Sequence, residues 1–293
     1  MAKYIKNETV LITTIYSKGK DFFKYFSNSL KKQTTKNFDL LLANDGVNQS
    51  YFVPFLKDIY FESINVSGKI SDNRRKLIFE AMKNYKKIIF SDSDDLLENN
   101  RIELVTKMLD KNYIIVNDID LLNENRSVIK KNYFSKRLID GCKINIKLLF
   151  SGNMMGLSNT AAKVEVFKKC PALLTTDDPY AFDWYLWSSI LLNNYDAKFT
   201  NKTTTKYICR SSSLTELERS IDAEYVIKVV NLKYEHYCLM KKLDNSFSKL
   251  AAEYKNMKEK LNDKIWMKKY VLQSKRDFVS NHFWWENIKN KSI

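Results

Sequence analysis

The chain has 293 residues, of which 44% are hydrophobic and 13% aromatic, so an intrinsically disordered protein is excluded and a full hydrophobic core is expected. Its formal net charge of +15 is typical of a protein with a polyanionic partner, either nucleic acid, an anionic membrane surface or a phosphate-rich substrate. Because the chain is rich in Lys, Asn and Ile and has only 6 Gly and 3 Pro, we attribute part of this charge to coding bias.

The cysteine pattern and the hydropathy of the chain indicate the cellular compartment. The four cysteines lie far apart without short paired spacings, which favours a reducing cytoplasm over a disulfide framework or a structural zinc site. The N-terminus has no apolar signal-peptide core, and no run of about 18 apolar residues occurs. We therefore expect a cytoplasmic protein, either soluble or peripheral at the inner face of the cytoplasmic membrane.

Strands and helices are expected to alternate through the first half of the chain. Short apolar runs predict strands at 10–15, 38–43, 61–66 and 87–90, and helical periodicity predicts helices at 21–33, 51–60 and 73–85. Alternation at this spacing predicts an α/β fold, with a mostly parallel sheet flanked by helices on both faces. In such sheets, ligands bind outside the carboxyl ends of the strands, where this chain has polar clusters.

The second half is predicted to contain further strands and a helix, followed by a long helical segment. We expect strands at 113–117 and 203–209, a strand or loop at 148–157, and a helix at 182–192. From about Leu214 the pattern becomes helical. Apolar residues then recur at gaps of three and four between 240 and 261, which predicts a coiled coil or a helical hairpin. A homodimer through 240–261 is one hypothesis for this segment.

The sharpest chemical signal is the acidic turn Ser91-Asp92-Ser93-Asp94-Asp95, directly after the expected strand 87–90. Three carboxylates at this spacing repel one another, and a divalent cation such as Mn²⁺ or Mg²⁺ relieves that repulsion while also binding substrate phosphates. The alternative is a solvated turn in which Asp95 caps a helix beginning near Glu98.

These segments, in this order, resemble the nucleotide-binding half of family 2 GT-A glycosyltransferases. The resemblance rests on the pair Gln33-Thr34, the turn Asn44-Asp45-Gly46 and the acidic turn. It implies a GT-A (Rossmann-like) catalytic domain over 1–213, with a nucleotide-sugar-binding half at 1–110 and an acceptor-side half at 111–213. An α-helical C-terminal extension would follow over 214–293.

The resemblance also implies roles for residues at the ends of the first two strands. Thr14 and Tyr16 would line the nucleotide pocket. Asp45 would accept a hydrogen bond from an imide N–H of the base, such as uracil offers, although Asn44 replaces the more usual first Asp of this turn.

Basic residues are expected near the diphosphate. The basic stretch Arg74-Arg75-Lys76 falls where the family places an Arg, with Arg75 and Lys76 as the candidates and a solvated helix start as the alternative. Arg210, after the expected strand 203–209, is a further candidate for contact with the diphosphate.

The acidic turn would complete the donor site. The resemblance implies that Asp94 and Asp92 bind the metal, with Asp92 and Ser93 also belonging to the nucleotide-sugar site. The cation would offset charge that builds up on the departing nucleoside diphosphate.

An inverting transfer needs a base for the acceptor hydroxyl, and the resemblance implies Asp183. Asp177 and Asp178 are rivals, and the alternative for Asp183 is a helix N-cap. Trp184 and Trp187 fit either an acceptor pocket or the core, and their helical spacing favours the core.

The C-terminal residues 264–293 combine seven Lys and Arg with aromatic residues that include Trp266, Trp284 and Trp285. This mixture is typical of docking on an anionic membrane. The alternative is that the aromatic residues pack against the catalytic domain while the lysines face solvent.

The sequence therefore predicts an inverting, metal-dependent glycosyltransferase that transfers a sugar from a nucleotide diphosphate donor, a UDP-sugar, to a hydroxyl of a bacterial surface glycan or glycolipid. A sugar nucleotidyltransferase is a second hypothesis, but only one glycine follows the first strand, in Tyr16-Ser17-Lys18-Gly19-Lys20, where such enzymes have a Gly-rich loop. A nucleic-acid-binding or scaffold protein is a third. Because no helix-turn-helix or zinc finger is visible, we expect no nucleic-acid partner.

Overall fold

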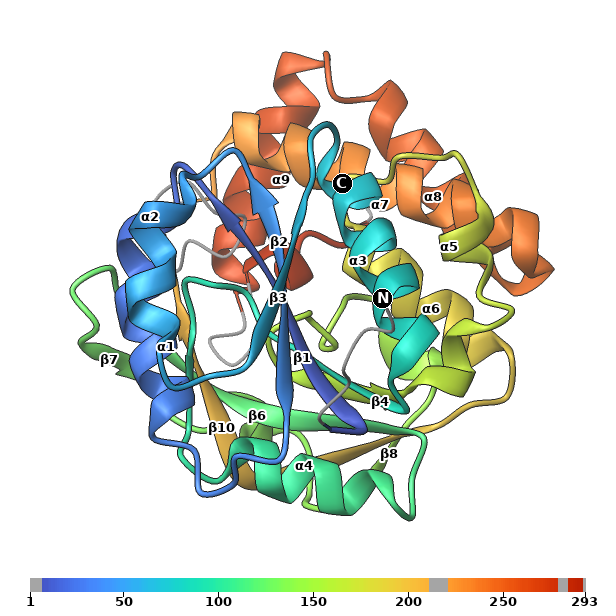
Figure 1. Ribbon diagram of the computed structural model, residues 1–293. Coiled ribbons are helices and arrows are strands. Elements are labelled where there is room, and N and C mark those ends of the chain that lie inside the picture. The colour runs from blue at the N-terminus through green and yellow to red at the C-terminus, as the bar shows by residue number, and fades with distance from the viewer. Residues whose placement is uncertain (1–6, 211–220, 279–283, 292–293) are drawn as a thin grey trace.

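The computed structural model describes residues 7–210, 221–278 and 284–291. Ten strands within these ranges form one curled sheet with helices around it (Figure 1). The strands are β1 (Thr9–Tyr16), β2 (Asp39–Asp45), β3 (Phe61–Asn65), β4 (Lys87–Phe90), β5 (Leu96–Leu97), β6 (Ile114–Leu122), β7 (Val128–Lys130), β8 (Lys143–Ile144), β9 (Thr160–Lys163) and β10 (Ala197–Ile208).

The helices of the sheet domain are α1 (Phe23–Lys31), α2 (Gln49–Phe52), α3 (Ile70–Asn84), α4 (Arg101–Leu109), α5 (Pro171–Leu174) and α6 (Phe182–Leu192). Those of the extension are α7 (Ala223–Leu243), α8 (Ser248–Glu259) and α9 (Lys264–Arg276). Short 3₁₀ turns are η1 (Lys20–Phe22), η2 (Val53–Leu56), η3 (Phe134–Lys136), η4 (Ile146–Leu149), η5 (Val164–Phe167), η6 (Asn245–Phe247) and η7 (Trp284–Asn287).

The N-terminal half of the sheet is parallel, in the order β3-β2-β1-β4. β1 and β2 are apolar on both faces because helices cover both sides, as parallel strands require. Tyr16 pairs in register with Asp45, and the Ser91 backbone N–H donates to the Ile12 carbonyl at 3.2 Å. The carboxyl ends of β1, β2 and β4 therefore meet at one edge, as the sequence predicts.

One central strand differs from the expected pattern. β9 lies between β4 and β6 and runs antiparallel to both. Its alanines, Ala161 and Ala162, are buried, but the segment has no hydrophobic pattern strong enough to predict a strand. The segment 148–157, expected as a strand or loop, contains the end of η4 and then a loop. The fold remains mostly parallel, with β6 and β10 also parallel.

Two hydrophobic clusters lie on the two faces of the sheet, and β1 supplies both. Val10 and Ile12 join the cluster that holds the side chains of α3, α6 and α7. Leu11 and Ile15 join the cluster that holds the side chains of α1, α2 and α4. This alternation follows from the two-residue period of a strand and confirms the prediction of helices on both faces.

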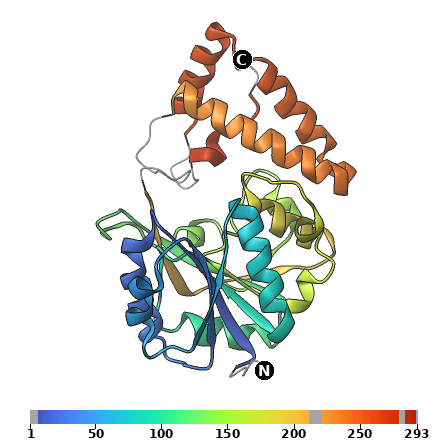
Figure 2. The same ribbon diagram turned by 45° about the horizontal axis from the view of Figure 1, so that its top comes forward.

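The extension forms a separate layer of helices against one end of the sheet domain (Figure 2). The predicted boundary at 213/214 lies outside the described residues. Most of the apolar repeat of 240–261 is buried within the chain: Met240, Phe247, Tyr254 and Met257 pack in the core around the α7–α8 hairpin, whereas Leu243 is 38% exposed. The hairpin alternative accounts for the buried residues, and a homodimer through this segment stays a prediction.

The aromatic residues of α9 also pack inward. Trp266 and Tyr270 are buried and stacked, with ring centroids 4.9 Å apart. The exposed apolar residues of this helix are Ile265 and Leu272, at 71% and 50%. Within the described ranges, no helix is both long and apolar enough to cross a membrane.

Candidate active site

A cavity of about 350 Å³ opens at the carboxyl ends of the parallel strands. We name it the acidic cavity; among the sequence-predicted residues it is lined by Thr14, Tyr16, Asp45, Asp92, Asp94 and Arg210. These residues follow β1, β2, β4 and β10 or end them, so residues from both halves of the sheet converge on one site. The structure thus brings together six candidate residues that are far apart in sequence.

Asp94 lies at the centre of the charge network in the acidic cavity. Its carboxylate pairs with the Arg210 guanidinium and accepts a hydrogen bond of 3.4 Å from the Tyr16 hydroxyl. Burial and repulsion from Asp92 raise the pKa of Asp94. Burial and the Asp94 charge raise the pKa of Tyr16 to about 12, so this hydroxyl remains a hydrogen-bond donor near neutral pH.

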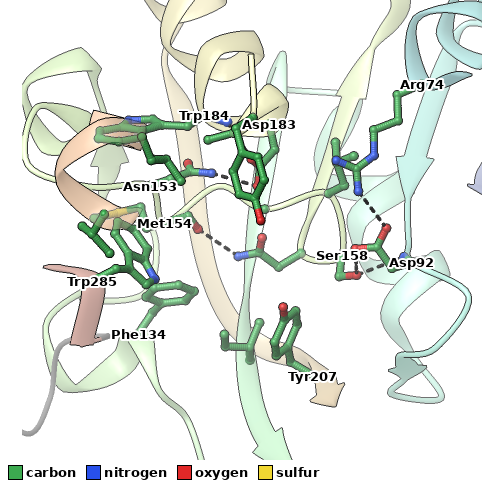
Figure 3. A pocket seen from close by; sticks show the side chains of 18 residues that line it. Arg74, Asp92, Phe134, Asn153, Met154, Ser158, Asp183, Trp184, Tyr207 and Trp285 are labelled. Atoms are coloured by element: carbon green, nitrogen blue, oxygen red, sulfur yellow. Dashed lines mark hydrogen bonds and ion pairs between the residues drawn. The ribbon is translucent and has the colours of Figure 1, made fainter. Parts of the chain in front are cut away.

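Asp92 faces the same cavity and is held by neighbours on two sides. The Ser158 hydroxyl donates to Asp92 Oδ2 at 3.2 Å, and the Asp92 backbone N–H donates back to Ser158 Oγ at 3.0 Å. On the other side, Arg74 Nη2 lies 3.6 Å from Asp92 Oδ1 (Figure 3).

Of the basic stretch 74–76, Arg74 lines the acidic cavity together with Arg210, whereas the candidates chosen from the sequence were its neighbours Arg75 and Lys76. Ile70, Asn73 and Arg74 all line it because positions i, i+3 and i+4 share one face of α3. Had the helix start at Ile70 been recognised, this spacing would have identified Arg74.

Arg75 and Lys76 point elsewhere. The buried guanidinium of Arg75 donates to the Ala172 carbonyl at 2.9 Å and to Asp72 at 2.8 Å. It also bonds to the Asp177 carbonyl and so braces the loop before α6. Lys76 Nζ donates to the Asn65 carbonyl at 3.0 Å. Neither residue lines the acidic cavity.

Two buried ionisable side chains, Asp95 and Arg101, lie behind the acidic turn and hold it through hydrogen bonds to neighbouring strands. Asp95 accepts a hydrogen bond of 2.8 Å from the Ile208 backbone N–H and does not cap a helix, since α4 begins only at Arg101. The Arg101 side chain donates to Asn117 Oδ1 at 2.8 Å and to the Phe90 carbonyl at 3.0 Å. Burial lowers the pKa of Arg101 to about 9, and the Asp95 charge opposes this shift.

Ser93, in the middle of the acidic turn, points away from the site. It is 1% exposed and is not among the residues that line the acidic cavity.

A second cavity, of about 300 Å³, adjoins the first (Figure 3). We name it the aromatic cavity; its wall includes Phe134, Tyr180, Trp184, Tyr207 and Trp285. It shares Arg74, Asp92 and Tyr207 with the acidic cavity, so the two spaces meet beside the acidic turn.

Asp183 lines the aromatic cavity from the first turn of α6. Asn153 Nδ2 donates to Asp183 Oδ2 at 3.1 Å, and the Trp184 backbone N–H donates to Oδ1 at 2.9 Å. Burial raises the pKa of Asp183, and the Arg74 charge opposes the rise. Ala181, not Asp183, is the N-cap residue, so capping does not explain this carboxylate.

The rival carboxylates are paired outside both cavities. Asp177 forms an ion pair of 3.2 Å with Lys242, and this hydrogen bond lowers the Asp177 pKa. Asp178 accepts from the Ser71 hydroxyl and pairs with Lys69 at 3.2 Å, which lowers its pKa too.

The two candidate tryptophans divide between core and cavity. Trp187 is fully buried, with its ring 5.4 Å from that of Phe90. Trp184 lines the aromatic cavity and stacks on His236 at 3.7 Å.

The donor atoms at the acidic turn fit a divalent cation that is shared with a phosphate ligand. Asp92 and Asp94 both line the cavity, and their repulsion raises the Asp94 pKa, a cost that a cation would remove. In the described part of the chain, no group of three or more His, Cys, Asp or Glu side chains could hold a metal. Such an ion would therefore need oxygen ligands from substrate or water, as Mg²⁺ commonly has.

Comparison with known proteins gives matches by structure. No family model matches the sequence, and no curated protein matches it. Residues 1–349 of S. aureus TarS in complex with UDP-GlcNAc align with a TM-score of 0.60 and 14% identity, over 85% of this chain and 72% of that one. The same TarS fragment with UDP aligns with a TM-score of 0.58 and 12% identity, over 94% and 96%.

A third match is GalNAc-T7 with UDP, GalNAc and Mn²⁺, with a TM-score of 0.53 and 12% identity over 79% of this chain and 51% of that one. The chain has a GT-A-like fold. The fold class predicted from the sequence is therefore confirmed. Because identities of this size show the fold alone, membership of family 2 remains a prediction.

Proposed function

We propose that the protein is a glycosyltransferase that binds a nucleotide diphosphate sugar, a UDP-sugar, in the acidic cavity and transfers the sugar to an acceptor hydroxyl in the aromatic cavity. One observation carries this proposal. The two cavities meet at Arg74 and Asp92, and the second contains a carboxylate, Asp183, whose pKa is raised. Neighbours of the same fold bind UDP or UDP-GlcNAc, which supports the donor class.

In this proposal the donor nucleotide lies across the ends of β1 and β2. Thr14 and Tyr16 line the nucleotide pocket, and Asp45 accepts a hydrogen bond from the base. Arg210 and Arg74 supply positive charge for the diphosphate, in place of Arg75 and Lys76. In the structure both guanidiniums pair with carboxylates of the acidic turn. They are therefore already positioned at the site, and phosphate oxygens would compete with these carboxylates for them.

We further propose that Asp94 and Asp92 hold Mn²⁺ or Mg²⁺ together with diphosphate oxygens, with Asp94 as the principal ligand. Bound there, the cation supplies charge neutralisation for the leaving nucleoside diphosphate. The GalNAc-T7 structure contains UDP and Mn²⁺, which is consistent with a divalent metal in this fold.

Asp183 is proposed as the general base of an inverting transfer. The acceptor hydroxyl oxygen attacks the anomeric carbon, the bond from that carbon to the diphosphate oxygen breaks, and the hydroxyl proton passes to Asp183. A raised pKa suits this role because the carboxylate then holds the transferred proton more tightly. Asn153 orients Oδ2 towards the cavity through its 3.1 Å hydrogen bond.

The proposed acceptor is a bacterial surface glycan or glycolipid, and α9 is proposed to contact an anionic membrane. The support is the exposed face of α9, where Ile265 and Leu272 lie on the same side as Lys268 and Lys269. Exposed apolar residues set among lysines suit the headgroup region of a bilayer.

Calorimetric titration of UDP, GDP, CDP and dTDP, each with and without Mn²⁺, tests the donor site. We expect UDP to bind with metal, and Asp94→Ala to weaken binding by at least about 10–100-fold, the range seen when even an outer partner of a metal site is lost. Asp196→Ala is the control, because that carboxylate lies on the surface with Lys143.

Unchanged metal-dependent UDP binding by Asp94→Ala would contradict the assignment of the metal ligand. If no diphosphate binds and the chain instead binds DNA in a salt-sensitive way, the glycosyltransferase proposal fails and the nucleic-acid hypothesis replaces it.

A further inference from the structure

The aromatic cavity has two chemically different ends (Figure 3). Arg74 and Asp92 lie at one end, next to the acidic turn, and Asp183 lies between this end and Trp184. Phe134 and Trp285 lie on the opposite side of the view, with Met154 beside them. A ligand that fills the cavity therefore needs polar groups at one end and an apolar surface at the other.

Trp285 reaches this wall from η7, in the C-terminal extension, although most other residues of the cavity belong to the sheet domain. Its ring centroid lies 6.2 Å from that of Trp184, at an angle of 49°. A Cβ on Gly152 would lie 2.6 Å from Cζ3 of Trp285, so the indole needs a glycine at 152 to occupy this place.

The neighbouring residue fixes the position of the indole. Glu286 is 5% exposed and forms a bidentate ion pair with Arg137. Arg137 Nη1 donates to Glu286 Oε1 at 2.8 Å, and Nη2 donates to Oε2 at 3.3 Å. The Arg137 guanidinium in turn lies 5.7 Å from the ring centroid of Phe134, which lines the same cavity. The ion pair thus ties the segment that carries Trp285 to Phe134, at the same end of the cavity.

The chain after Glu286 is held as firmly. Ile288 is fully buried, and its carbonyl accepts from Lys233 Nζ at 2.9 Å and from the Tyr254 hydroxyl at 3.0 Å. Lys233 Nζ also donates to the Ser151 carbonyl at 3.1 Å, next to Gly152. These contacts make Trp285 a built part of the wall.

A sugar ring meets both requirements of the cavity. Its hydroxyls can bond to the Asp183 end, and the C–H bonds on its apolar face carry partial positive charge that the negative face of an indole attracts. A hydrocarbon tail would leave the polar end without partners. The volume of about 300 Å³ is at the small end of ligand sites, which suits one ring better than a long chain.

We propose that Trp285 recognises the apolar face of an acceptor sugar ring, and that the C-terminal segment 284–288 thereby determines acceptor specificity. This inference rests on the proposed glycosyl transfer. The C-terminal extension would then contribute a side chain to the active site, although it is distant in sequence from the other residues of that site.

Saturation-transfer NMR on the full chain tests the inference. Aromatic protons are saturated in the presence of UDP and diamagnetic Mg²⁺, and the methyl β-pyranosides of glucose, galactose and N-acetylglucosamine serve as probes. Trp285→Ala and Gly152→Ala, which remove and displace the indole, should each reduce transfer to the ring protons by at least about five-fold. Trp285→Phe should retain most of the transfer, and Phe278→Ala, an exposed aromatic residue, is the control.

Calorimetric UDP binding by the same variants separates the two proposals. Two results, each with UDP affinity intact, would overturn the role of Trp285. One is saturation transfer to the glycoside in Trp285→Ala that equals the wild-type value. The other is a wild type that transfers saturation to none of the glycosides. A wild type that binds no UDP would overturn the proposed function itself. Loss of the glycoside signal with UDP affinity preserved is the result we expect.

Discussion

At the scale of single residues, the environment separates three aspartates that look alike in sequence. Asp177 and Asp178 are paired with lysines or a serine hydroxyl at the surface, and these contacts lower their pKa values. Asp183, only five positions further on, is desolvated against the aromatic cavity, and its pKa is raised. A base that must keep a proton during transfer is better matched by the second environment.

We expect Asp183→Asn to reduce sugar transfer by about 10²–10⁴-fold, the usual contribution of a general base, while UDP affinity stays unchanged. The rate of UDP release from a UDP-sugar donor in the presence of acceptor measures this. Because the Asp183 pKa is raised, the carboxylate becomes protonated at a higher pH than an ordinary Asp. The wild-type rate should therefore fall on acidification before the usual Asp range is reached.

Asp177→Asn is the matched control and should keep the wild-type rate and pH profile. If Asp177→Asn abolished transfer while Asp183→Asn did not, the assignments of the two carboxylates would have to be exchanged.

At the scale of elements, α9 presents two different faces. Trp266, Met267 and Tyr270 pack inward, so Trp266, one of the aromatic residues that suggested a membrane anchor, stabilises the extension instead. Lys268 and Lys269 remain exposed with their apolar neighbours on the outer face. The proposed membrane contact of α9 would thus rely on these lysines and not on Trp266.

The double change Lys268→Glu and Lys269→Glu should reduce binding to phosphatidylglycerol vesicles by at least about 30-fold, since each basic residue near an anionic surface contributes about 1 kcal/mol. Vesicle sedimentation at low salt measures it. Lys57→Glu with Lys111→Glu changes the net charge equally on exposed residues of the sheet domain. Equal loss in both double variants would mean that net charge, and not α9, determines the binding.

At the scale of the whole molecule, Lys233 joins three parts of the chain. Its fully buried Nζ bonds to Ser151 in the sheet domain and to Ile288 in the C-terminal segment, and it lies 3.4 Å from the Tyr254 hydroxyl of α8. Burial lowers the pKa of Lys233 to about 7, with the Glu286 charge opposing and the Lys289 charge adding to the shift. The contact that docks the extension is therefore sensitive to pH.

Between pH 7 and the ordinary lysine range, the unfolded chain binds the Lys233 proton and the folded protein does not. Stability should then rise with pH across this window, since the unfolded state binds more protons. Lys233→Met should lack this contribution, so its Tm relative to wild type should fall steadily from pH 7 to 9.5. Thermal unfolding measures the difference, with the exposed Lys241→Met on the same helix as control.

A constant Tm difference between Lys233→Met and wild type over this range would show that Lys233 does not titrate there.

Features that depend on neighbours along the chain could be predicted from the amino-acid sequence. Buried apolar runs predicted β1, β2 and β4, and helical periodicity predicted α6 at its observed bounds. Once these strands are parallel, their polar ends must meet, so the convergence of Thr14, Asp45 and Asp94 also followed from the sequence.

Features that depend on long-range packing could be established only from the folded molecule. The direction of β9 depends on the strands on either side of it, and the choice of Arg74 over Arg75 depends on the rotation of α3 against the sheet. The position of Trp285 in the aromatic cavity depends on Gly152 and Arg137, far earlier in the chain. Periodicity reports which side chains share a face, but what that face meets is a property of the folded molecule.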